Sequence, residues 1–440
     1  MVASVHPELF LTGHLLLSAK SASSAVQNSW ATRVVYEKDS TLAFGRRLQQ
    51  AGSMSPLAML FPLLCASAPV AASGISQGWR SDGYHVFPGG DLQQAVEAAA
   101  LNPTNKVVRV HAGIYRPLTK RQALIWFNRS HNGVRLEAIG EVTLTANNNE
   151  LAGSDSSAPA AVVNHVVYFG DGIGGDTVLV GFRISGANHF VTTQPPEIEP
   201  DTSFKKDLFF YADGGAIKIF GHSAPTLRRL EIVDNYASPC AGGISIQQKW
   251  AADTPAPAPV RIESCLFYRN RSQITGAAVD LLPGSSAVIS NCLFVGNVAN
   301  LGVNFISADQ AQPEFTNSAP LTVFPTSRAV VQQCTFTGNR NGIEDLGHRS
   351  IYQNCAFWRN ELRGGFYGEN PYDLYIEDEA QVTGCVFGGS VMDRRGVVSK
   401  LANAFKAPDP RFDSQFKPAS LQYARAGIRS PISLPKPTGQ

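Results

Sequence analysis

The phrase Cys265-Leu-Phe267-Tyr-Arg-Asn270 decides the fold, because variants of it recur along the second half of the chain. Its copies are Cys292-Leu-Phe294-Val-Gly-Asn297, Cys334-Thr-Phe336-Thr-Gly-Asn339, Cys355-Ala-Phe357-Trp-Arg-Asn360, the shorter Cys385-Val-Phe387 and the apolar Leu230-Glu-Ile232-Val-Asp-Asn235. An aliphatic or aromatic residue stands three positions before each copy. A phrase repeated in this way is typical of a solenoid, in which each copy stacks on the next.

The side chains of the phrase have predictable directions. Strand side chains alternate between two faces, so Cys and Phe of each copy point to the same side, which we expect to be the interior. The Asn three residues after Phe falls at a corner, where its side chain can bond the turn backbone and tolerate unusual dihedral angles. Neighbouring strands lie about 4.8 Å apart, so the sequence predicts a Cys column, a Phe column and an Asn ladder.

A second phrase alternates with the first. Its copies are Gly215-Ala-Ile217-Lys218-Ile219, Gly242-Gly-Ile244-Ser245-Ile246, Gly276-Ala-Ala-Val279-Asp280-Leu281 and the weaker Gly302-Val303-Asn304-Phe305 and Gly342-Ile343-Glu344-Asp345-Leu346. Each reads as a short strand with two inward aliphatic residues around one outward polar residue, although Asp345 takes an inward position. Two strand types in every repeat predict an all-β fold, a single-stranded parallel β-helix.

Over residues 84–430 the chain resembles the right-handed parallel β-helix proteins of the pectate-lyase-like superfamily. Asp91 can begin a helix, with Gln94 completing a capping box, and the apolar face of residues 92–99 resembles the N-terminal capping helix of that superfamily. The strand 107–115 follows it, and residues 407–412 resemble the tail that ends such helices. The resemblance implies a right-handed coil. It implies less about function, because the superfamily includes lyases, hydrolases, epimerases and adhesins.

Composition and the N-terminal segments limit the class of protein. The net charge is +2 over 440 residues, which favours neither nucleic acid nor an anionic membrane as partner. No apolar run is long enough to span a bilayer. Residues 54–73 read as a signal peptide, the alternative being an ordinary buried helix, and residues 1–53 carry no fold pattern, as an over-extended N-terminus would. We expect the β-helix domain over 84–430 and a C-terminal tail over 431–440.

Aligning the second phrase predicts one outward column of polar side chains: Lys218, Ser245, Asp280, Asn304 and Glu344. Two coils separate Asp280 from Glu344, or about 9–10 Å, which suits an acid/base pair that acts through a water molecule. Lys218 lies as far on the other side of Asp280 and could neutralise a uronate carboxylate. Ser245 and Asn304 are expected to bind substrate. The structural alternative is that these side chains only solvate the face of the sheet.

Small residues stand beside this column, at Ala216, Gly243, Ala278, Gly302 and Gly342. They would let an extended polymer lie close to the backbone. The long interruptions of the repeat, residues 190–213, 247–259, 307–327 and 363–380, are the expected walls of such a groove.

Two further clusters combine residue types that can do chemistry. Residues 344–349 contain Glu344, Asp345, His348 and Arg349; imidazole can act as general base and guanidinium can pair with a carboxylate. Ordinary turn chemistry explains the same pattern. Phe210 and Tyr211 are a candidate platform for sugar stacking, with an aromatic plug beneath a loop as the alternative.

Cysteines and acidic residues suggest no certain metal or cofactor. Five of the seven cysteines occupy the repeat position beside Phe, so we expect a stack of free thiols, and Cys240 lies outside that column. Calcium is common among lyases of the superfamily, and Asp171, Asp176, Asp213 and Asp234 could supply oxygen ligands. No run has the spacing of a dedicated calcium loop.

Together these patterns predict an exported protein, secreted, periplasmic or on the cell surface, that binds and processes a polysaccharide, with an acidic polymer favoured. The reaction would be of lyase, hydrolase or epimerase type. The alternative is a non-catalytic, adhesin-like surface module. A monomer is the default, since a helix and a tail protect the ends of many β-helices.

Overall fold

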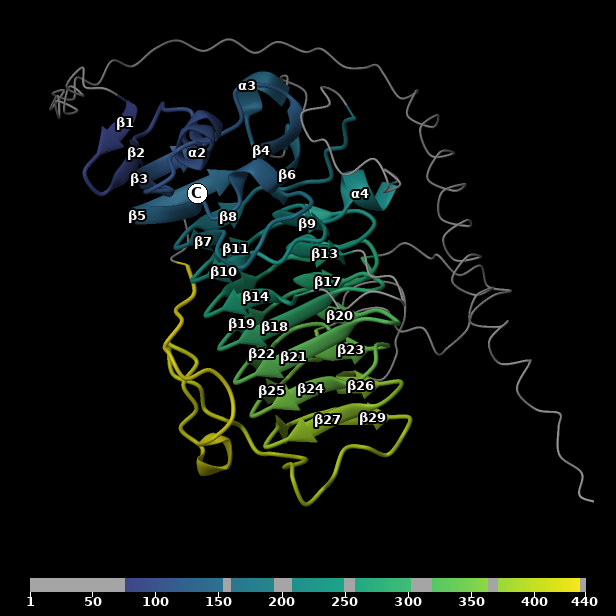
Figure 1. Cartoon of the computed structure of the whole chain (residues 1–440). Helices are drawn as coiled ribbons and strands as arrows, with labels where there is room; N and C mark the ends of the chain where they lie inside the picture. The colour runs from purple at the N-terminus through teal and green to yellow at the C-terminus, as the bar shows by residue number, and fades with distance from the viewer. Residues whose placement is uncertain are drawn as a thin grey trace, which may run out of the picture. The chain divides into compact units, whose positions relative to one another are not determined.

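A computed structural model describes residues 76–152, 160–193, 208–248, 258–301, 319–362 and 371–435 of the chain (Figure 1). Strands dominate, and they lie in stacked layers along the described part of the molecule. The segment 54–73 and the N-terminus before it fall outside the described residues. Among the described residues, no helix is long and apolar enough to cross a membrane.

One sheet of nine strands runs along the molecule, and its strands are parallel throughout. In spatial order its members are β4 (Arg121–Phe127), β6 (Val163–Phe169), β9 (Ile217–Gly221), β13 (Ile244–Gln248), β17 (Val279–Leu281), β20 (Leu321–Val323), β23 (Ile343–Asp345), β26 (Tyr372–Ile376) and β29 (Ser390–Asp393). We call it the second-phrase sheet, because β9, β13, β17 and β23 are copies of that phrase.

A second sheet of 18 strands carries the Cys-x-Phe phrase. It begins with β1 (Gln77–Arg80), which is antiparallel to β2 (Gly83–Val86), and continues with β3 (Val107–Tyr115) and β5 (Arg135–Thr145) in parallel pairing. It then divides into two parallel ladders. One contains β7 (Val178–Val180), β10 (Thr226–Arg228), β14 (Val260–Glu263), β18 (Ser286–Ser290), β21 (Arg328–Gln332), β24 (Ser350–Gln353) and β27 (Ala380–Thr383). The other contains β8 (Arg183–Ser185), β11 (Glu231–Val233), β15 (Leu266–Tyr268), β19 (Leu293–Val295), β22 (Thr335–Thr337), β25 (Ala356–Trp358) and β28 (Val386–Phe387).

The chain passes through both sheets in turn, and each such pass is a coil of a parallel, solenoid-like fold. β12 (Tyr236–Ala237) and β16 (Arg271–Ser272) add a short parallel pair at one corner. The main hydrophobic core contains residues from Tyr84 to Phe387. The all-β, parallel and repetitive architecture predicted from the two phrases is therefore confirmed.

The repeated phrase builds the three predicted columns. Phe267, Phe294, Phe336, Phe357 and Phe387 stack face to face, with ring centroids 4.3–5.1 Å apart. The amide groups of Asn235, Asn270, Asn297, Asn339 and Asn360 bond one to the next at 2.9–3.1 Å. The described cysteines are all buried and free of disulfides, as predicted for the five in the repeat.

After each Cys-x-Phe strand the chain turns one residue earlier than the sequence predicts, at the residue before the ladder Asn. The ladder asparagines do not have positive φ angles. The residue before each of them does, as at Asp234 (54°), Arg269 (53°) and Gly296 (65°). The Asn side chain is thus free to bond the neighbouring coils, and its predecessor takes the left-handed conformation that turns the chain.

Helix α2 (Leu92–Ala100) forms where the sequence predicts it. Asp91 is the N-cap and accepts a hydrogen bond from the Gln94 backbone, and the apolar face, from Leu92 to Ala99, is buried in the main core. The predicted capping box is only half formed, because the backbone N–H of Asp91 donates to the side chain of Gln77 rather than to that of Gln94.

The remaining helices are short: η2 (Arg129–His131), α3 (Asn149–Ala152), α4 (Leu208–Ala212) and η4 (Leu421–Tyr423). The chain after η4 turns back along the outer face of the second sheet, where Ile428 packs with Val233, Leu266 and Leu293. In Figure 1 this segment, drawn in yellow, runs beside the coils. An apolar strip that faces outward is thereby covered by the chain itself.

Candidate functional site

The outward residues of the second-phrase sheet form one column in strict register. From β4 to β29 the column contains Trp126, Tyr168, Lys218, Ser245, Asp280, Thr322, Glu344, Tyr375 and Met392. The predicted alignment of Lys218, Ser245, Asp280 and Glu344 is therefore confirmed. Thr322 of β20 occupies the slot that the sequence assigned to Asn304, and Asn304 itself lies outside the described residues.

These side chains face outward from the coil and yet are buried. Lys218, Ser245 and Asp280 are 0 % exposed and Glu344 is 1 % exposed. The column is therefore an enclosed polar cluster and not the open strip that the sequence predicts. The segments predicted as groove walls fall largely outside the described residues.

The small residues beside the column have a structural reason. A Cβ atom added to Gly243 would lie 2.2 Å from the carbonyl oxygen of Ala278, and one added to Gly342 would lie 1.9 Å from that of Asp373. Ala216 and Ala278 belong to the main core. Neighbouring coils approach so closely here that larger residues do not fit, so these positions are not a floor for a polymer.

Lys218 is held in the column by hydrogen bonds to its neighbours. Its Nζ atom donates to the backbone oxygen of Phe209, at 2.8 Å, and to Oγ of Ser245, at 3.1 Å. Nδ1 of His165 lies 2.9 Å from the backbone oxygen of Gly214. Burial and the nearby charge of Lys218 lower the pKa of His165 to about 3, so this imidazole is neutral at physiological pH.

Asp280 is the residue best suited to proton transfer. Burial raises its pKa to about 7, against the opposing effects of hydrogen bonds from Thr275 and Cys240 and of the positive charge of Lys218. The hydroxyl oxygen of Thr275 is 2.9 Å from Oδ2 of Asp280 and 3.0 Å from Sγ of Cys240. A carboxyl group with this pKa is present in both protonation states near neutral pH, as a general acid or base requires.

Cys240, which the sequence left without a role, belongs to the same cluster. Its backbone N–H donates to Oδ1 of Asp213 at 3.0 Å, and burial together with the charges of Asp213 and Asp280 raises the pKa of its thiol. Sequence reasoning missed this residue and Thr275 because both stand in turns just before the repeated strand. Their closeness to Asp280 depends on how successive coils stack.

The residues from Glu344 to Arg349 are not brought together. Glu344 lies in the column, and Asp345 points into the core, where it accepts a hydrogen bond from the Tyr352 hydroxyl at 2.8 Å. His348 and Arg349 lie at an exposed corner and face Asp378 and Glu379 of the next coil. The turn chemistry that was the alternative prediction accounts for the last two residues, which do not reach Glu344.

The aromatic pair at α4 divides between two roles. Phe210 is 1 % exposed and packs edge-on against Tyr168 and Phe220, with centroids 5.9 and 4.7 Å apart. Its faces are occupied by protein, as in the aromatic plug of the alternative prediction. Tyr211 is less buried and also packs edge-on against Phe210, at 4.8 Å.

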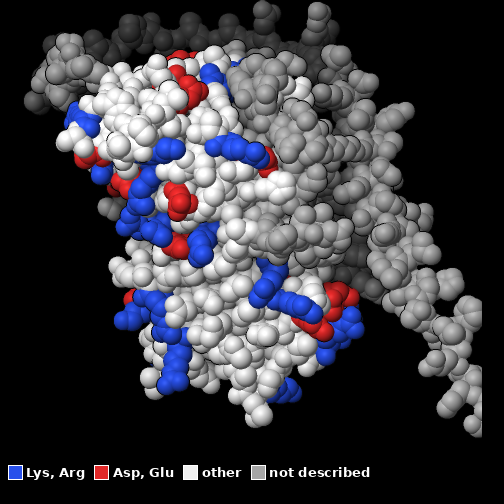
Figure 2. Space-filling view, in the orientation of Figure 1, with Lys and Arg blue, Asp and Glu red and all other residues white. Residues whose placement is uncertain are grey.

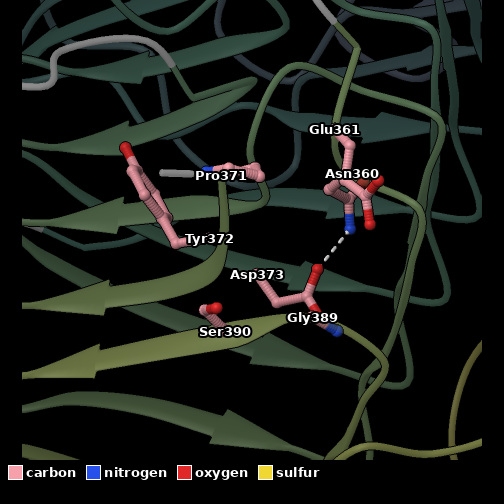
Figure 3. Close-up of a pocket in the computed structure, with 7 residues that line it drawn as sticks. All are labelled: Asn360, Glu361, Pro371, Tyr372, Asp373, Gly389 and Ser390. Atoms are coloured by element: carbon pink, nitrogen blue, oxygen red, sulfur yellow. Dashed lines mark hydrogen bonds between the residues drawn. The ribbon is translucent and has the colours of Figure 1, made fainter. Parts of the chain in front are cut away.

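A small pocket of about 60 Å³ lies at the last step of the Asn ladder, lined by Asn360, Glu361, Pro371, Tyr372, Asp373, Gly389 and Ser390 (Figure 3). Asp373 ends the ladder, because its Oδ1 accepts from the Asn360 amide at 3.0 Å and its Oδ2 from the Gly389 backbone at 2.6 Å. Burial raises the pKa of Asp373 to about 6. The carboxylate thus replaces the asparagine that the shorter final phrase lacks.

Three of the four acidic residues considered for calcium have protein partners of their own, Asp213 through the backbone of Cys240. Asp171 pairs with Arg129 and His222, and Asp234 pairs with Arg269. Within the described ranges, no group of three or more His, Cys, Asp or Glu side chains is arranged to hold a metal ion. Figure 2 shows basic and acidic side chains interspersed on the described part of the visible face.

The comparisons with known proteins give no relative for this chain: no protein-family model, curated protein or solved structure matches it.

Proposed function

We propose that this chain is an exported, right-handed β-helix protein of the pectate-lyase-like kind that binds and processes an acidic polysaccharide. In this proposal α2 caps the N-terminal end of the coil, the domain spans residues 84–430 and the protein acts as a monomer. The parallel stacking and the main core, which extends from Tyr84 to Phe387, support it.

The observation that carries the proposal is the protonation behaviour of Asp280 within the outward column. Its pKa of about 7 suits proton transfer to or from a sugar. Glu344 stands two strand spacings away, with Thr322 between them, so the two backbones lie about 9–10 Å apart. That separation is at the upper limit of the range for two carboxyl groups that act through a water molecule.

Lys218 stands two strands from Asp280 on the other side, with Ser245 between them. A buried ammonium group at this distance would bind the carboxylate of a uronate one sugar unit away from the reacting bond. The positive charge of Lys218 favours a negatively charged ligand, because Lys218 is the basic side chain of the outward column. An acidic polymer is therefore preferred to a neutral one.

Because the column is buried, this function requires that a substrate can reach its side chains. Cys240 is a native reporter of access, since its thiol lies beside Thr275 and Asp280. In a Cys65→Ser background, we expect Cys240 to react with a maleimide faster than the five stacked cysteines, and an acidic polymer to slow that reaction. Equal, negligible labelling of all six thiols would contradict access to the column.

Activity is tested by a screen of uronate-containing and neutral polysaccharides, reading both the absorbance of unsaturated products and the release of reducing ends. We expect turnover of an acidic polymer, reduced at least about 100-fold in Asp280→Asn. Asp378→Asn, which changes a half-buried acid outside the column, is the matched control and should keep full activity. Turnover that survives Asp280→Asn would remove Asp280 from the mechanism.

The burial of the column favours a second candidate, the non-catalytic, adhesin-like surface module. In that case Lys218 and Asp280 serve only to hold the strands of successive coils, each bonded to its own neighbours. Polymer or surface binding without product in either readout would select this function over the enzyme.

A further inference from the structure

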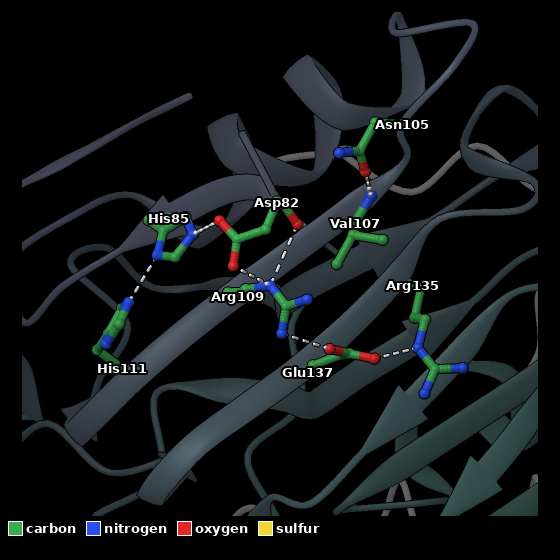
Figure 4. A network of polar contacts seen from close by, with 8 residues as sticks. All are labelled: Asp82, His85, Asn105, Val107, Arg109, His111, Arg135 and Glu137. Atoms are coloured by element: carbon green, nitrogen blue, oxygen red, sulfur yellow. Dashed lines mark hydrogen bonds and ion pairs between the residues drawn. The ribbon is translucent and has the colours of Figure 1, made fainter. Parts of the chain in front are cut away.

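A separate polar network lies at the first strands of the second sheet, far along the sequence from Asp280 (Figure 4). His85 of β2 pairs in register with Arg109 of β3, and His111 follows two residues later on the same face. The alternate residues Tyr84, Val86, Val108 and Val110 are buried in the core. The histidines therefore point away from the core because of strand alternation.

The two imidazoles face each other, and a carboxylate fixes one of them. Nε2 of His85 is 2.8 Å from Oδ1 of Asp82, and Nδ1 of His85 is 2.8 Å from Nε2 of His111. Asp82 can only accept when ionised, so Nε2 of His85 carries the proton. Its Nδ1 then has a bare lone pair, directed toward the His111 ring.

Neighbouring residues hold this arrangement in place. Nε of Arg109 is 3.0 Å from Oδ2 of Asp82, and the hydrogen bond to His85 is the largest influence that lowers the pKa of Asp82. The Phe87 ring stacks on His111 at 4.1 Å, nearly parallel, with the Arg80 guanidinium 4.9 Å from the Phe87 centroid. The His85 side chain is 7 % exposed. The two rings are thus held next to each other before any ligand arrives.

We propose that His85 and His111 form a binding site for a divalent transition-metal ion, with Cu²⁺ preferred. Neutral imidazole nitrogens are the common protein ligands of such ions, and a carboxylate on the far nitrogen is the usual partner of a metal-bound histidine. Asp82 stands in that position for His85. Water completes the coordination, since the described residues supply only these two imidazoles.

The separation of the two nitrogens selects the ion. Two ligands at right angles around a metal, at bonds of about 2.0 Å, lie about 2.8 Å apart. The two nitrogens, now 2.8 Å apart, need not separate to share such an ion, but both rings must rotate, because their nitrogens face each other in a hydrogen bond with ring centroids 5.0 Å apart. The tetrahedral geometry of Zn²⁺ needs about 3.3 Å and would require the rings to move apart. Cu²⁺ prefers tetragonal geometry, with ligands at right angles, and it stands at the top of the divalent affinity series. Both properties favour Cu²⁺ over Zn²⁺ at this site.

Binding needs a change of tautomer in His111 and a rotation of both rings that turns the two lone pairs toward one ion. In the free site its Nε2–H donates to His85; with metal bound, the proton sits on Nδ1 and the Nε2 lone pair faces the ion. The ring stays neutral, so no proton is released.

The test is titration of the full chain with Cu²⁺, Ni²⁺ and Zn²⁺ near neutral pH, by calorimetry and by electron paramagnetic resonance for Cu²⁺. We expect one saturable Cu²⁺ site with two nitrogen ligands, tighter than for the other two ions. His85→Asn and His111→Asn should each abolish this site. Asp82→Asn should weaken it about 10- to 100-fold.

His348→Asn is the matched control, because His348 is a partly exposed histidine that faces two carboxylates and no second imidazole among the described residues. It should leave the Cu²⁺ site unchanged. Thermal unfolding of each variant without metal checks that it is folded. Saturable binding that is absent, or that persists unchanged in His85→Asn and His111→Asn, would overturn the proposal.

Discussion

Two stacks of side chains run along this molecule, and they differ in composition. The Asn ladder repeats one residue from Asn235 to Asn360, and each amide bonds the next. The outward column of the second-phrase sheet changes residue at every step, from Lys218 through Asp280 to Glu344. Both stacks are buried, and both follow the same strand spacing.

The difference separates a structural repeat from a local site. An asparagine carries a donor and an acceptor, so a row of identical asparagines satisfies itself however many coils there are. A lysine or a carboxylate cannot be paired in this way by a copy of itself. Each charged member of the column therefore depends on particular neighbours, such as Ser245 for Lys218 and Thr275 for Asp280.

The largest effect is expected from breaking the ladder at its centre with Asn297→Ala. Its Oδ1 accepts from the backbone and amide of Asn270, and its Nδ2 donates to Phe267 and Asn339. Several buried groups lose partners at about 1–3 kcal/mol each, so the free energy of unfolding should fall by about 4–6 kcal/mol. Urea denaturation measures it; exposed Gln353→Ala, the control, should change it by less than about 0.5 kcal/mol.

Phe294→Ala tests the inward aromatic column beside the ladder. Phe294 stacks between Phe267 and Phe336, at 4.6 and 4.3 Å, and is fully buried. The cavity should cost about 3–5 kcal/mol of unfolding free energy in the same assay. Phe294→Leu fills most of that space and should cost clearly less; equal losses for both variants would contradict a packing role.

Asp280→Asn tests whether a charged member of the outward column makes stability depend on pH, which the uncharged Asn ladder does not. The folded pKa of about 7 exceeds the ordinary value of 3.8, so the folded protein binds the extra proton between these values. Stability from this group is full below about pH 4 and is lost as pH rises through 7. The wild type should lose about 2–3 kcal/mol more than Asp280→Asn between about pH 5 and pH 8. Unfolding curves at the two pH values measure the difference, and equal losses would refute it.

The smallest effect is expected from Tyr352→Phe, which removes the hydrogen bond to Asp345 inside the core. Burial raises the pKa of Asp345 to about 6. The hydrogen bond from Tyr352 therefore stabilises the folded protein most when this carboxyl is ionised. The loss should be about 1–2 kcal/mol and larger at pH 8 than at about pH 5. Tyr268→Phe, on the outer face, serves as control with no such pH dependence.

Much of the fold could be predicted from the sequence because its cause is local. Alternation places Cys265 and Phe267 inward, and the repeat implies that equivalent residues stack. The bend at Asp234 and Arg269, one residue before each Asn, could not be predicted in the same way. It depends on which backbone groups the neighbouring coils leave for the Asn side chain to bond.

The candidate site was predictable only in part. The register of Lys218, Ser245, Asp280 and Glu344 follows from the repeat, whereas the slot given to Asn304 belongs to Thr322, because the fourth strand begins later in the chain. The burial of the column, and the approach of Cys240 and Thr275 to Asp280, had no signal in the sequence. They arise from segments that are distant in sequence and adjacent in space.

The sequence alone therefore determined the repeat, the parallel stacking and the inward columns, because strand alternation and a shared spacing dictate them residue by residue. Only the tertiary structure decided that the polar column is enclosed, that Asp280 has a raised pKa and that His85 faces His111. The burial of these side chains and their contacts depend on which coils lie next to each other, and no single stretch of sequence determines that.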